Sequence, residues 1–432
     1  MKKIFSGIAN IFKVPELRKK ILFTAIILVV YRIGCQIPIP FLNKSVLASL
    51  VSQGGGSLFG LVDVFTGGAF SNATIFALSI SPYINASIII QLLCVAFDSL
   101  GKLAKEGDEG RKKIDRITRY SAIGLALVEA VAITWGIHNS LSNFNFFIMA
   151  VVVLTMTAGT ALIVWLGDLV TEKGISNGIS LIIFVNIISR GPSAVSTMIS
   201  YYSNGLLGNK VVGILIMALV VVVFLAVIGC VVWVNEAERR LPVKYAKRVV
   251  GSKMYGGQAT YVPIKVCWAG VLPIIFAMSI MVLPSTIVSF IWPSSTNAFI
   301  VFLRDQWTGG WVYNVVYAVL IVAFTFFYTY IQFNPVDLAN NIQSNGGFIP
   351  GIRPGRETAA YITKVLHRLT WFSGMFLAVV QLFPSLLGTI TGINGLWLGG
   401  SSVFIMVGVA LEVVRSAESM MIMRHHSGFL ED

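Results

Sequence analysis

The sequence contains few charged residues, and this scarcity is its most informative feature. Of its 432 residues, 12% are Asp, Glu, Lys or Arg, whereas soluble globular proteins carry about a quarter. Apolar residues make up 56% of the chain. Because a soluble protein of this length needs a charged surface, the composition argues against a separate soluble domain. It indicates a polytopic membrane protein.

Residues that bind metals or carry out catalysis are also scarce. The four His residues lie in or next to loops or near the end of the chain, and no two Asp occupy the apolar runs, so an intramembrane enzyme has no constellation to use. No Gly-rich loop followed by Lys and Ser or Thr occurs. We therefore expect no enzyme activity and no cofactor. The cysteines stand apart without the spacing of a metal site, at Cys35, Cys94, Cys230 and Cys267.

Ten apolar stretches have the length, about 20 residues, that a helix needs to cross a bilayer. The fifth is interrupted by Arg190, Gly191 and Pro192. We therefore predict an all-α polytopic membrane protein with ten transmembrane helices. The predicted spans are residues 21–39, 73–95, 117–137, 146–166, 178–198, 211–234, 266–291, 312–332, 366–388 and 396–414.

The few charges are distributed asymmetrically between the two sides of these spans. If the N-terminus is cytoplasmic, the segments on that side hold 27 of the 32 Lys and Arg residues. The other side keeps only Lys44, Arg190, Lys210 and Arg304, and Arg32 lies inside the first span. By the positive-inside rule, both termini are expected in the cytoplasm. The net charge of +13 is then a signal of topology and requires no nucleic-acid partner.

Ten spans with both ends on one side can consist of two five-span halves of opposite topology. The second and seventh spans share a Pro-x-Ile-x-Ala pattern, beginning at Pro82 and Pro273. The fifth and tenth share Gly-x-Ser-x-x-Ile, beginning at Gly178 and Gly400. A duplicated five-span unit requires this correspondence. We therefore divide the chain into halves at residues 1–205 and 206–432.

The matched patterns place two pairs of isoleucines at similar depths in their spans, and two more isoleucines lie one turn earlier. If the halves pack face to face, these side chains converge near the pseudo-symmetry axis and form an apolar constriction. Ordinary helix packing is the alternative, since isoleucine is common in membrane helices. The six residues are Ile80, Ile84, Ile179, Ile183, Ile275 and Ile405.

The segment GGGSLFGLVDVFTGGAFSNA, residues 54–73, is apolar but too short to span a bilayer. It can form a re-entrant half-helix where protein or a water-filled cavity surrounds it. A helix lying on the outer surface is the alternative. The candidate residues are Ser57, Leu58, Phe59, Leu61, Val62, Asp63, Phe65, Gly67 and Gly68.

Polar residues in the second span also need an explanation. Asn85, Ser87 and Gln91 cost free energy in lipid, so we expect them to face a neighbouring helix or a channel. Hydrogen bonds to backbone carbonyls in a fixed bundle are the alternative.

Two connections on the predicted cytoplasmic side, residues 235–265 and 333–365, are longer than a compact bundle needs. The second contains Pro350-Gly351 and Pro354-Gly355, turn pairs that hold Arg353 on a stiff tip. The candidate docking residues of the two connections are Arg239, Arg240, Lys244, Lys247, Arg248, Lys253, Arg353 and Arg356.

Four stretches resemble the SecY family of bacterial protein-translocation channels: FALSISPYINASIIIQLL, TEKGISNGISLIIF, ERRLPVKYAKR and NPVDLANNIQSNGGFIPGIRPGRETAAYI. The likeness covers nearly the whole chain. It implies two five-helix halves around a pore that passes unfolded secretory and membrane proteins and opens sideways to the lipid bilayer. It places a pore ring on the six isoleucines, a plug at about residues 57–71, and the opening to lipid beside the polar residues of the second span.

The same resemblance implies partners and a location. The cytoplasmic connections would dock the ribosome or the motor ATPase SecA, the small subunits SecE and SecG would accompany the channel, and the membrane would be the bacterial cytoplasmic one. One departure concerns the first connection. Where many members carry two arginines before a tyrosine, this chain has Ser252-Lys253, which puts the strength of that docking contact in doubt.

An ion-coupled secondary transporter is the main alternative, because such proteins also use inverted repeats and broken helices. It predicts ionisable residues that face each other near mid-membrane. The candidates are Glu129 with Arg32 and Glu412 with Arg415, and no chain of Asp, Glu or His runs through the spans.

Overall fold

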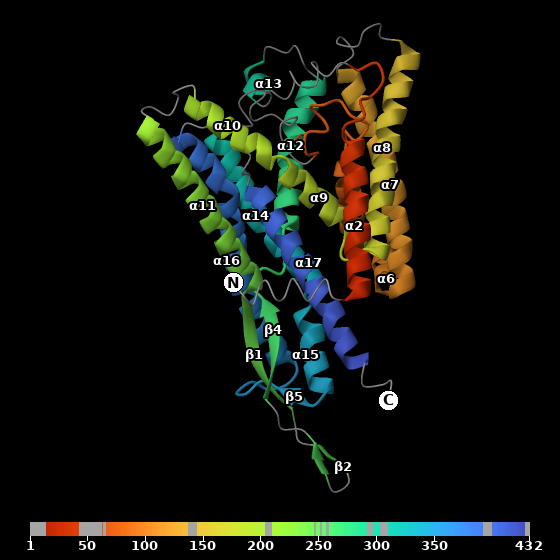
Figure 1. Cartoon of the computed structure of the whole chain (residues 1–432). Coiled ribbons are helices and arrows are strands. Elements are labelled where there is room, and N and C mark those ends of the chain that lie inside the picture. The colour runs from red at the N-terminus through yellow and green to blue at the C-terminus, as the bar shows by residue number, and fades with distance from the viewer. Residues whose placement is uncertain are drawn as a thin grey trace.

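A bundle of long helices forms the main body of the molecule, and a small sheet projects from one end of it (Figure 1). We call this end the sheet end and the other the opposite end. The computed structural model describes residues 14–42, 63, 66–136, 145–203, 210–245, 248–250, 253–255, 259–291, 297–302, 310–391 and 400–427.

Each of the ten predicted spans coincides with a helix or with a pair of helices. The second span contains α5 (Ser81–Ala96), which bends by 108° into α6 (Asp98–Lys105). The fifth is divided between α9 (Gly178–Ser189) and α10 (Gly191–Ser203). A further short helix is α13 (Ala298–Val301). The other spans are α2 (Pro15–Gly34), α7 (Asp108–Gly136), α8 (Phe146–Lys173), α11 (Lys210–Glu236), α12 (Leu272–Ile291), α14 (Trp311–Gln332), α16 (Arg356–Thr391) and α17 (Gly400–Ser427).

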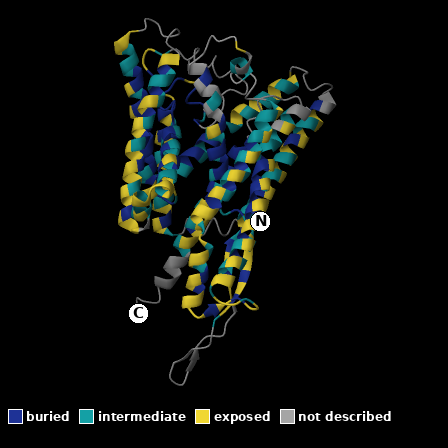
Figure 2. Ribbon diagram, turned by 180° about the vertical axis from the view of Figure 1, so that it is seen from behind, coloured by how far each residue is buried: buried dark blue, intermediate teal, exposed yellow. Residues whose placement is uncertain are grey.

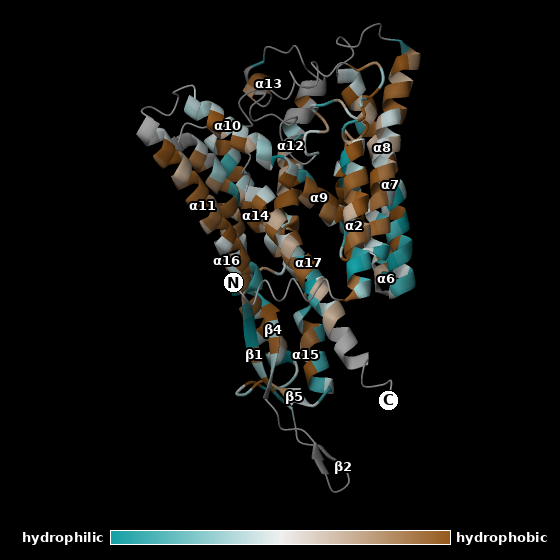
Figure 3. Cartoon of the chain, in the orientation of Figure 1, coloured by the Kyte–Doolittle hydropathy of each residue, from teal (hydrophilic) through white to brown (hydrophobic). Residues whose placement is uncertain are grey.

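The outer faces of these helices are apolar and exposed, as a lipid environment requires. Within the described residues, seven helices are long and apolar enough to cross a membrane, or eight if the bent pair is one span. Their exposed side chains include Leu215 and Val222, which are 66% and 63% accessible. Figure 2 shows exposed residues along the outside of the bundle, and Figure 3 shows that these helices are hydrophobic. The predicted all-α membrane fold is confirmed.

Two local breaks have identifiable causes. Residues 66–80 form turns, because Ala73 and Ser79 adopt the left-handed conformation at φ +52° and +50°, and α5 begins with Pro82 as its second residue. The predicted span at 73–95 is therefore helical only from Ser81. The fifth span breaks at Arg190, the residue where the sequence pattern was interrupted.

The two long connections join into one small domain at the sheet end. Strands β1 (Glu238–Tyr245), β4 (Ala259–Lys265) and β5 (Gly347–Phe348) form an antiparallel sheet in the order β4-β1-β5. A separate hairpin pairs β2 (Arg248–Val250) with β3 (Lys253–Tyr255). Helix α15 (Pro335–Ser344) and the start of α16 cover the sheet through Leu241, Ile342 and Ile362. Strands were not predicted from the sequence, in which these connections have the length and charge of cytoplasmic loops.

Candidate functional site

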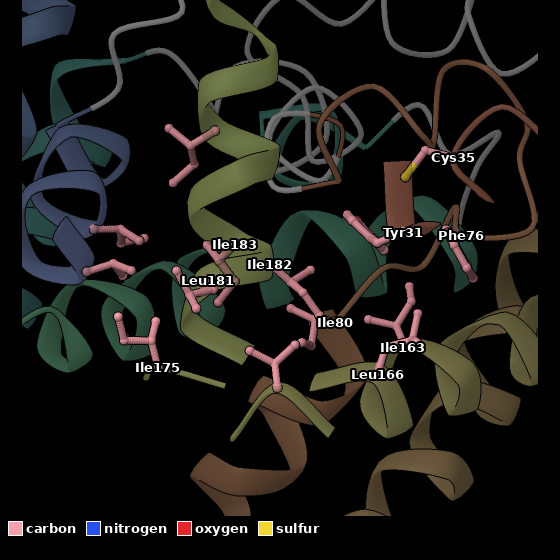
Figure 4. Packing of buried hydrophobic residues seen from close by; sticks show 14 of the residues in the cluster. Tyr31, Cys35, Phe76, Ile80, Ile163, Leu166, Ile175, Leu181, Ile182 and Ile183 are labelled. Carbon is pink, nitrogen blue, oxygen red and sulfur yellow. The ribbon is translucent and has the colours of Figure 1, made fainter. Parts of the chain in front are cut away.

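The six predicted isoleucines meet in one apolar cluster within the bundle. Three of them are buried and three are half-buried against the same cluster, although they come from α9, α12, α17 and the start of α5. Figure 4 shows Ile80 and Ile183 among their buried neighbours. The buried members are Ile80, Ile183 and Ile405, and the half-buried ones are Ile84, Ile179 and Ile275.

Two cavities adjoin this cluster from different sides. The larger, of about 810 Å³, extends toward the sheet end, where Lys265 and Met420 line it. The smaller, of about 50 Å³, is lined by Thr66 and Ser79 from the turns before α5. Four isoleucines line both cavities and therefore lie between them: Ile84, Ile183, Ile275 and Ile405. Of the other two, Ile179 lines the larger cavity and Ile80 the smaller.

The matched sequence patterns occupy equivalent positions in their helices. Pro82 and Pro273 are the second residues of α5 and α12, so Ile84 and Ile275 each follow two residues later. Their helices also run in opposite directions past the cluster, because α5 passes from the smaller cavity to the larger and α12 from the larger to the smaller. In both helices the proline at the second position therefore sets how far the isoleucine lies from the start of the helix.

The glycine pattern has an equally specific cause. Gly178 and Gly400 are the first residues of α9 and α17. A Cβ on Gly178 would lie 2.1 Å from the carbonyl oxygen of Gly167 in α8, and one on Gly400 would lie 2.1 Å from that of Val380 in α16. Both helices thus start in close backbone contact with the preceding long helix, which only glycine permits.

The described part of the predicted plug is packed against the end of α9. Asp63 is buried, and its carboxylate forms an ion pair with Arg190. Gly67 and Gly68 follow in turns with φ values of +63° and +89°. Ser57, Leu58, Phe59, Leu61, Val62 and Phe65 lie outside the described residues.

The polar residues of the second span connect α5 to two neighbouring helices. Asn85 Nδ2 donates a hydrogen bond to Glu129 Oε1 of α7 at 3.1 Å. Gln91 Nε2 lies 3.3 Å from Ser87 Oγ, and Gln91 Oε1 accepts from the Tyr328 hydroxyl of α14 at 3.0 Å. Tyr328 was not predicted as a partner of these residues, because aromatic residues are common throughout the spans.

The candidate docking residues at the sheet end are exposed wherever their side chains are described. Arg353 occupies a turn in which Gly351 and Gly355 have φ values of +83° and +97°. Its carbonyl oxygen accepts a hydrogen bond from Thr358 Oγ1 at 2.9 Å, which fixes the backbone below the exposed guanidinium. The other exposed residues are Arg239, Arg240, Lys244 and Arg356. Arg248 and Lys253 belong to the β2–β3 hairpin, and Lys247 lies outside the described residues.

Three of the four ionisable residues proposed for ion coupling have other partners, and Arg32 forms no ion pair with Glu129 in the part of the chain described. Glu129 accepts from Asn85, and Glu412 Oε1 accepts from Ser176 Oγ at 3.2 Å. Arg415 forms an ion pair with Glu236 at 2.7 Å rather than with Glu412. In the part of the chain that the structure describes, no three His, Cys, Asp or Glu residues are grouped as metal ligands. The transporter alternative therefore gains no support.

Known proteins resemble this chain in sequence and in fold. The family model for SecY matches residues 74–414. The protein translocase subunit SecY of Aquifex aeolicus is 41% identical over 430 residues, which cover 97% of this chain and 98% of the relative. The corresponding subunit of Thermotoga maritima is 38% identical over 441 residues, covering 99% and 98%.

Solved structures of protein-conducting channels share the fold at low sequence identity. A SecY protein, whose plug domain is described as stabilising the closed state, aligns with a TM-score of 0.61 at 18% identity. That alignment covers 96% of this chain and 95% of the other. Sec61 from a canine ribosome–channel complex aligns with a TM-score of 0.58 at 15% identity, with the same coverage. Because the sequence match spans nearly the full length and the fold agrees, this multi-pass membrane chain belongs to the SecY family.

Proposed function

We propose that this chain is a protein-conducting channel that passes unfolded polypeptides across the membrane through the six-isoleucine constriction. One observation supports this proposal most directly: four isoleucines separate a large cavity from a small one. Isoleucine has no hydrogen-bond donor or acceptor in its side chain, so it does not hold a passing chain. Its stiff, branched side chains form a narrow apolar collar of the kind that excludes water and ions.

The contact between α5 and α14 is the proposed exit for hydrophobic segments into lipid. Ile88 of α5 packs with Phe276 of α12 and Tyr328 of α14 in one apolar cluster. The hydrogen bond between Gln91 and Tyr328 crosses the same contact. Gln91 thus provides a polar contact that can break and re-form when these helices separate, while Ser87 contacts Gln91 within α5 and Asn85 joins α5 to α7.

The segment at residues 57–71 is the proposed plug. Its described residues lie beside the smaller cavity, which Thr66 lines. Asp63, buried against α9, is anchored at the side of the passage. In this position the segment can block the passage on the side of the isoleucine collar that faces the opposite end of the bundle. A polypeptide entering the passage can displace it.

The domain at the sheet end is the proposed docking platform for the ribosome and for SecA. Sec61 in a canine complex and Ssh1 in a yeast complex are both bound to ribosomes in related structures. Ribosomal RNA attracts Lys and Arg through its phosphates, and Arg239, Arg240 and Lys244 are exposed on this domain. Arg353 is the proposed contact with the motor. By family, SecE and SecG are the expected small subunits.

The proposed location is the bacterial cytoplasmic membrane, with both termini in the cytoplasm. Helix α2 begins, and α17 ends, at the sheet end of the bundle (Figure 1). The sheet end carries the basic connections, so the positive-inside rule assigns it to the cytoplasm.

The experiment that tests the function uses vesicles containing the purified channel with its co-purifying small subunits. A secretory precursor, SecA and ATP are added outside, and the fraction of precursor protected from protease is measured. We expect protection that depends on both the channel and ATP. Equal protection in vesicles that lack the channel would contradict the proposal.

A further inference from the structure

The last turn of α9 presents three polar side chains to the buried segment that precedes α5. Asn186, Ser189 and Arg190 are three and four residues apart, so they share one face of the helix end. Each contacts a residue between Asp63 and Ser79. Because the contacting residues are at least 107 positions apart in the sequence, these contacts exist only in the folded chain.

Arg190 holds the first part of the segment. Its guanidinium forms an ion pair with the Asp63 carboxylate, and its Nη2 also donates to the Asp63 carbonyl oxygen at 3.2 Å. The other carboxylate oxygen of Asp63 accepts from the Ser71 backbone N–H at 2.8 Å. One buried carboxylate thus ties α9 to the turns at residues 66–71. Removing either partner would leave a buried charge without compensation, which is strongly destabilising.

Gly67 brings the backbone of the segment directly onto α9. A Cβ on this residue would lie 2.9 Å from Asn186 Cα and 3.0 Å from the Asn186 carbonyl oxygen. Ser189 Oγ lies 3.4 Å from the Gly67 carbonyl oxygen. Any larger residue, at a φ of +63°, would push the segment away from the helix.

Asn186 holds the other end of the segment. Its Nδ2 donates to Ser79 Oγ at 3.3 Å, and its Oδ1 accepts from the Tyr31 hydroxyl at 2.8 Å. Ser79 has a φ of +50°, a conformation that residues other than glycine adopt only when their surroundings impose it. The next residue is Ile80 of the constriction. The contact with Asn186 therefore helps to set the direction in which Ile80 points.

We infer that Asn186, Ser189 and Arg190 are positioning residues that form a latch on the closed channel. The latch holds Asp63 and residues 66–79 against α9 and keeps Ile80 in the constriction. This inference rests on the proposed function, in which the segment closes the pore. When the segment is displaced into a water-filled passage, Asp63 and Arg190 become hydrated, so separation of their charges becomes less costly. Water entry and release of the segment are thereby coupled.

Ion conductance at rest tests the latch. The channel, purified with its small subunits, is placed in planar lipid bilayers without any translocation substrate. Asp63→Asn and Arg190→Gln each leave one charge unpaired, and we expect each to increase the fraction of time in a conducting state at least tenfold. The double variant has no unpaired buried charge and should conduct less than either single variant.

Arg119→Gln is the matched control, because it breaks a different ion pair. Arg119 Nε lies 3.0 Å from Asp168 Oδ2, and this pair joins α7 to α8 away from the segment. We expect its resting conductance to equal that of the unaltered channel. Gly67→Ala is a second, independent variant that keeps both latch charges but displaces the segment, and it should also conduct at rest.

The outcomes separate the latch from the seal. If Asp63→Asn, Arg190→Gln and Gly67→Ala all remain closed while glycine variants of the constriction leak, the latch is wrong and the seal stands. If the constriction variants do not leak either, the proposed seal itself is wrong. If Asp63→Asn and Arg190→Gln do not accumulate in the membrane, a Gly67→Ala channel that does not conduct at rest would still overturn the inference.

Discussion

A hydrogen bond joins the helix faces that must separate at the proposed exit to lipid. The Tyr328 hydroxyl of α14 donates to Gln91 of α5. A hydrogen bond between neutral groups contributes about 1 kcal/mol net, because water replaces it when it breaks. Apolar packing around Ile88 and Phe276 supplies the remaining contact. The opening is thus held by interactions that are individually weak and reversible.

We predict that Tyr328→Phe makes lateral exit easier. The variant keeps the ring packing and removes one hydrogen bond, so the closed contact should lose about 1 kcal/mol, or roughly fivefold in the opening equilibrium. The measurement is the hydrophobicity at which half of a test segment enters lipid, which should fall. Tyr330→Phe is the control, since that hydroxyl faces His367 of α16 instead. An unchanged threshold in Tyr328→Phe would show that the bond does not restrain the opening.

Among the elements, the domain at the sheet end combines a rigid core with exposed cations. Leu241 and Val243 of β1 are buried, while Arg240 and Lys244 alternate with them on the exposed face. The turn that carries Arg353 is fixed by glycines with positive φ and by the hydrogen bond from Thr358. A guanidinium on a fixed backbone loses little entropy on binding and can contact a carboxylate or phosphate with two hydrogen bonds.

We predict that Arg353→Glu cripples translocation driven by SecA without affecting membrane insertion of the channel. Reversing a charge at an interface commonly costs several kcal/mol, enough for a loss of about a hundredfold or more. Arg353→Lys should be intermediate, since it keeps the charge and loses the paired hydrogen bonds. Precursor protection and SecA binding are measured in reconstituted vesicles. Arg111→Glu, a charge reversal at an exposed position of α7, is the control. If Arg353→Glu translocates precursor at the wild-type rate, this turn is only a spacer and does not contact the motor.

The proposed plug is an element whose loss is expected to be tolerated. Deleting residues 57–71 removes the segment that the latch restrains, so the closed state should leak more often. Transport should continue, because neighbouring chain can partly refill the cavity. Resting conductance and precursor protection, measured on the same preparation, check both parts of this prediction. Full loss of transport in a properly inserted variant would mean that the segment has another role.

The sequence allowed the helices to be located, but their partners had to be seen in the structure. The length of an apolar stretch predicts a membrane span, and Pro82 or Gly178 predicts where a helix begins. The depth of a residue along its span could therefore be predicted. Nothing local links Asp63 to Arg190, which lie 127 residues apart, or Gln91 to Tyr328. The alternation of Leu241 and Val243 with exposed residues is a strand pattern that predicts β1. Because the segment is rich in Lys and Arg, only its charge was used in the prediction.

For the whole molecule, we propose that an internal repeat builds the seal from two parts of one chain. Each part contributes a helix that begins with a proline pattern and one that begins at a tightly packed glycine. On this proposal, duplication places two isoleucines from each part at one level. When the two parts separate, all four contacts loosen together, so closure depends on the arrangement of the whole bundle.

We predict that replacing Ile84, Ile183, Ile275 and Ile405 together with glycine makes the resting channel leak ions and small solutes. The change removes the apolar collar between the cavities, so water can fill the passage and carry ions through it. Conductance in planar bilayers without substrate is the measurement.

A matched control separates loss of the collar from loss of helix stability, because each glycine inside a helix costs about 1 kcal/mol. The same four helices offer residues on their outer faces: Ile89 is 44%, Ile188 is 45%, Ile280 is 42% and Val414 is 51% exposed. A variant with glycine at these four positions carries the same backbone cost and leaves the collar intact, so it should stay closed. Equal conductance in the two variants would mean that bundle stability, and not the isoleucine collar, keeps the channel sealed.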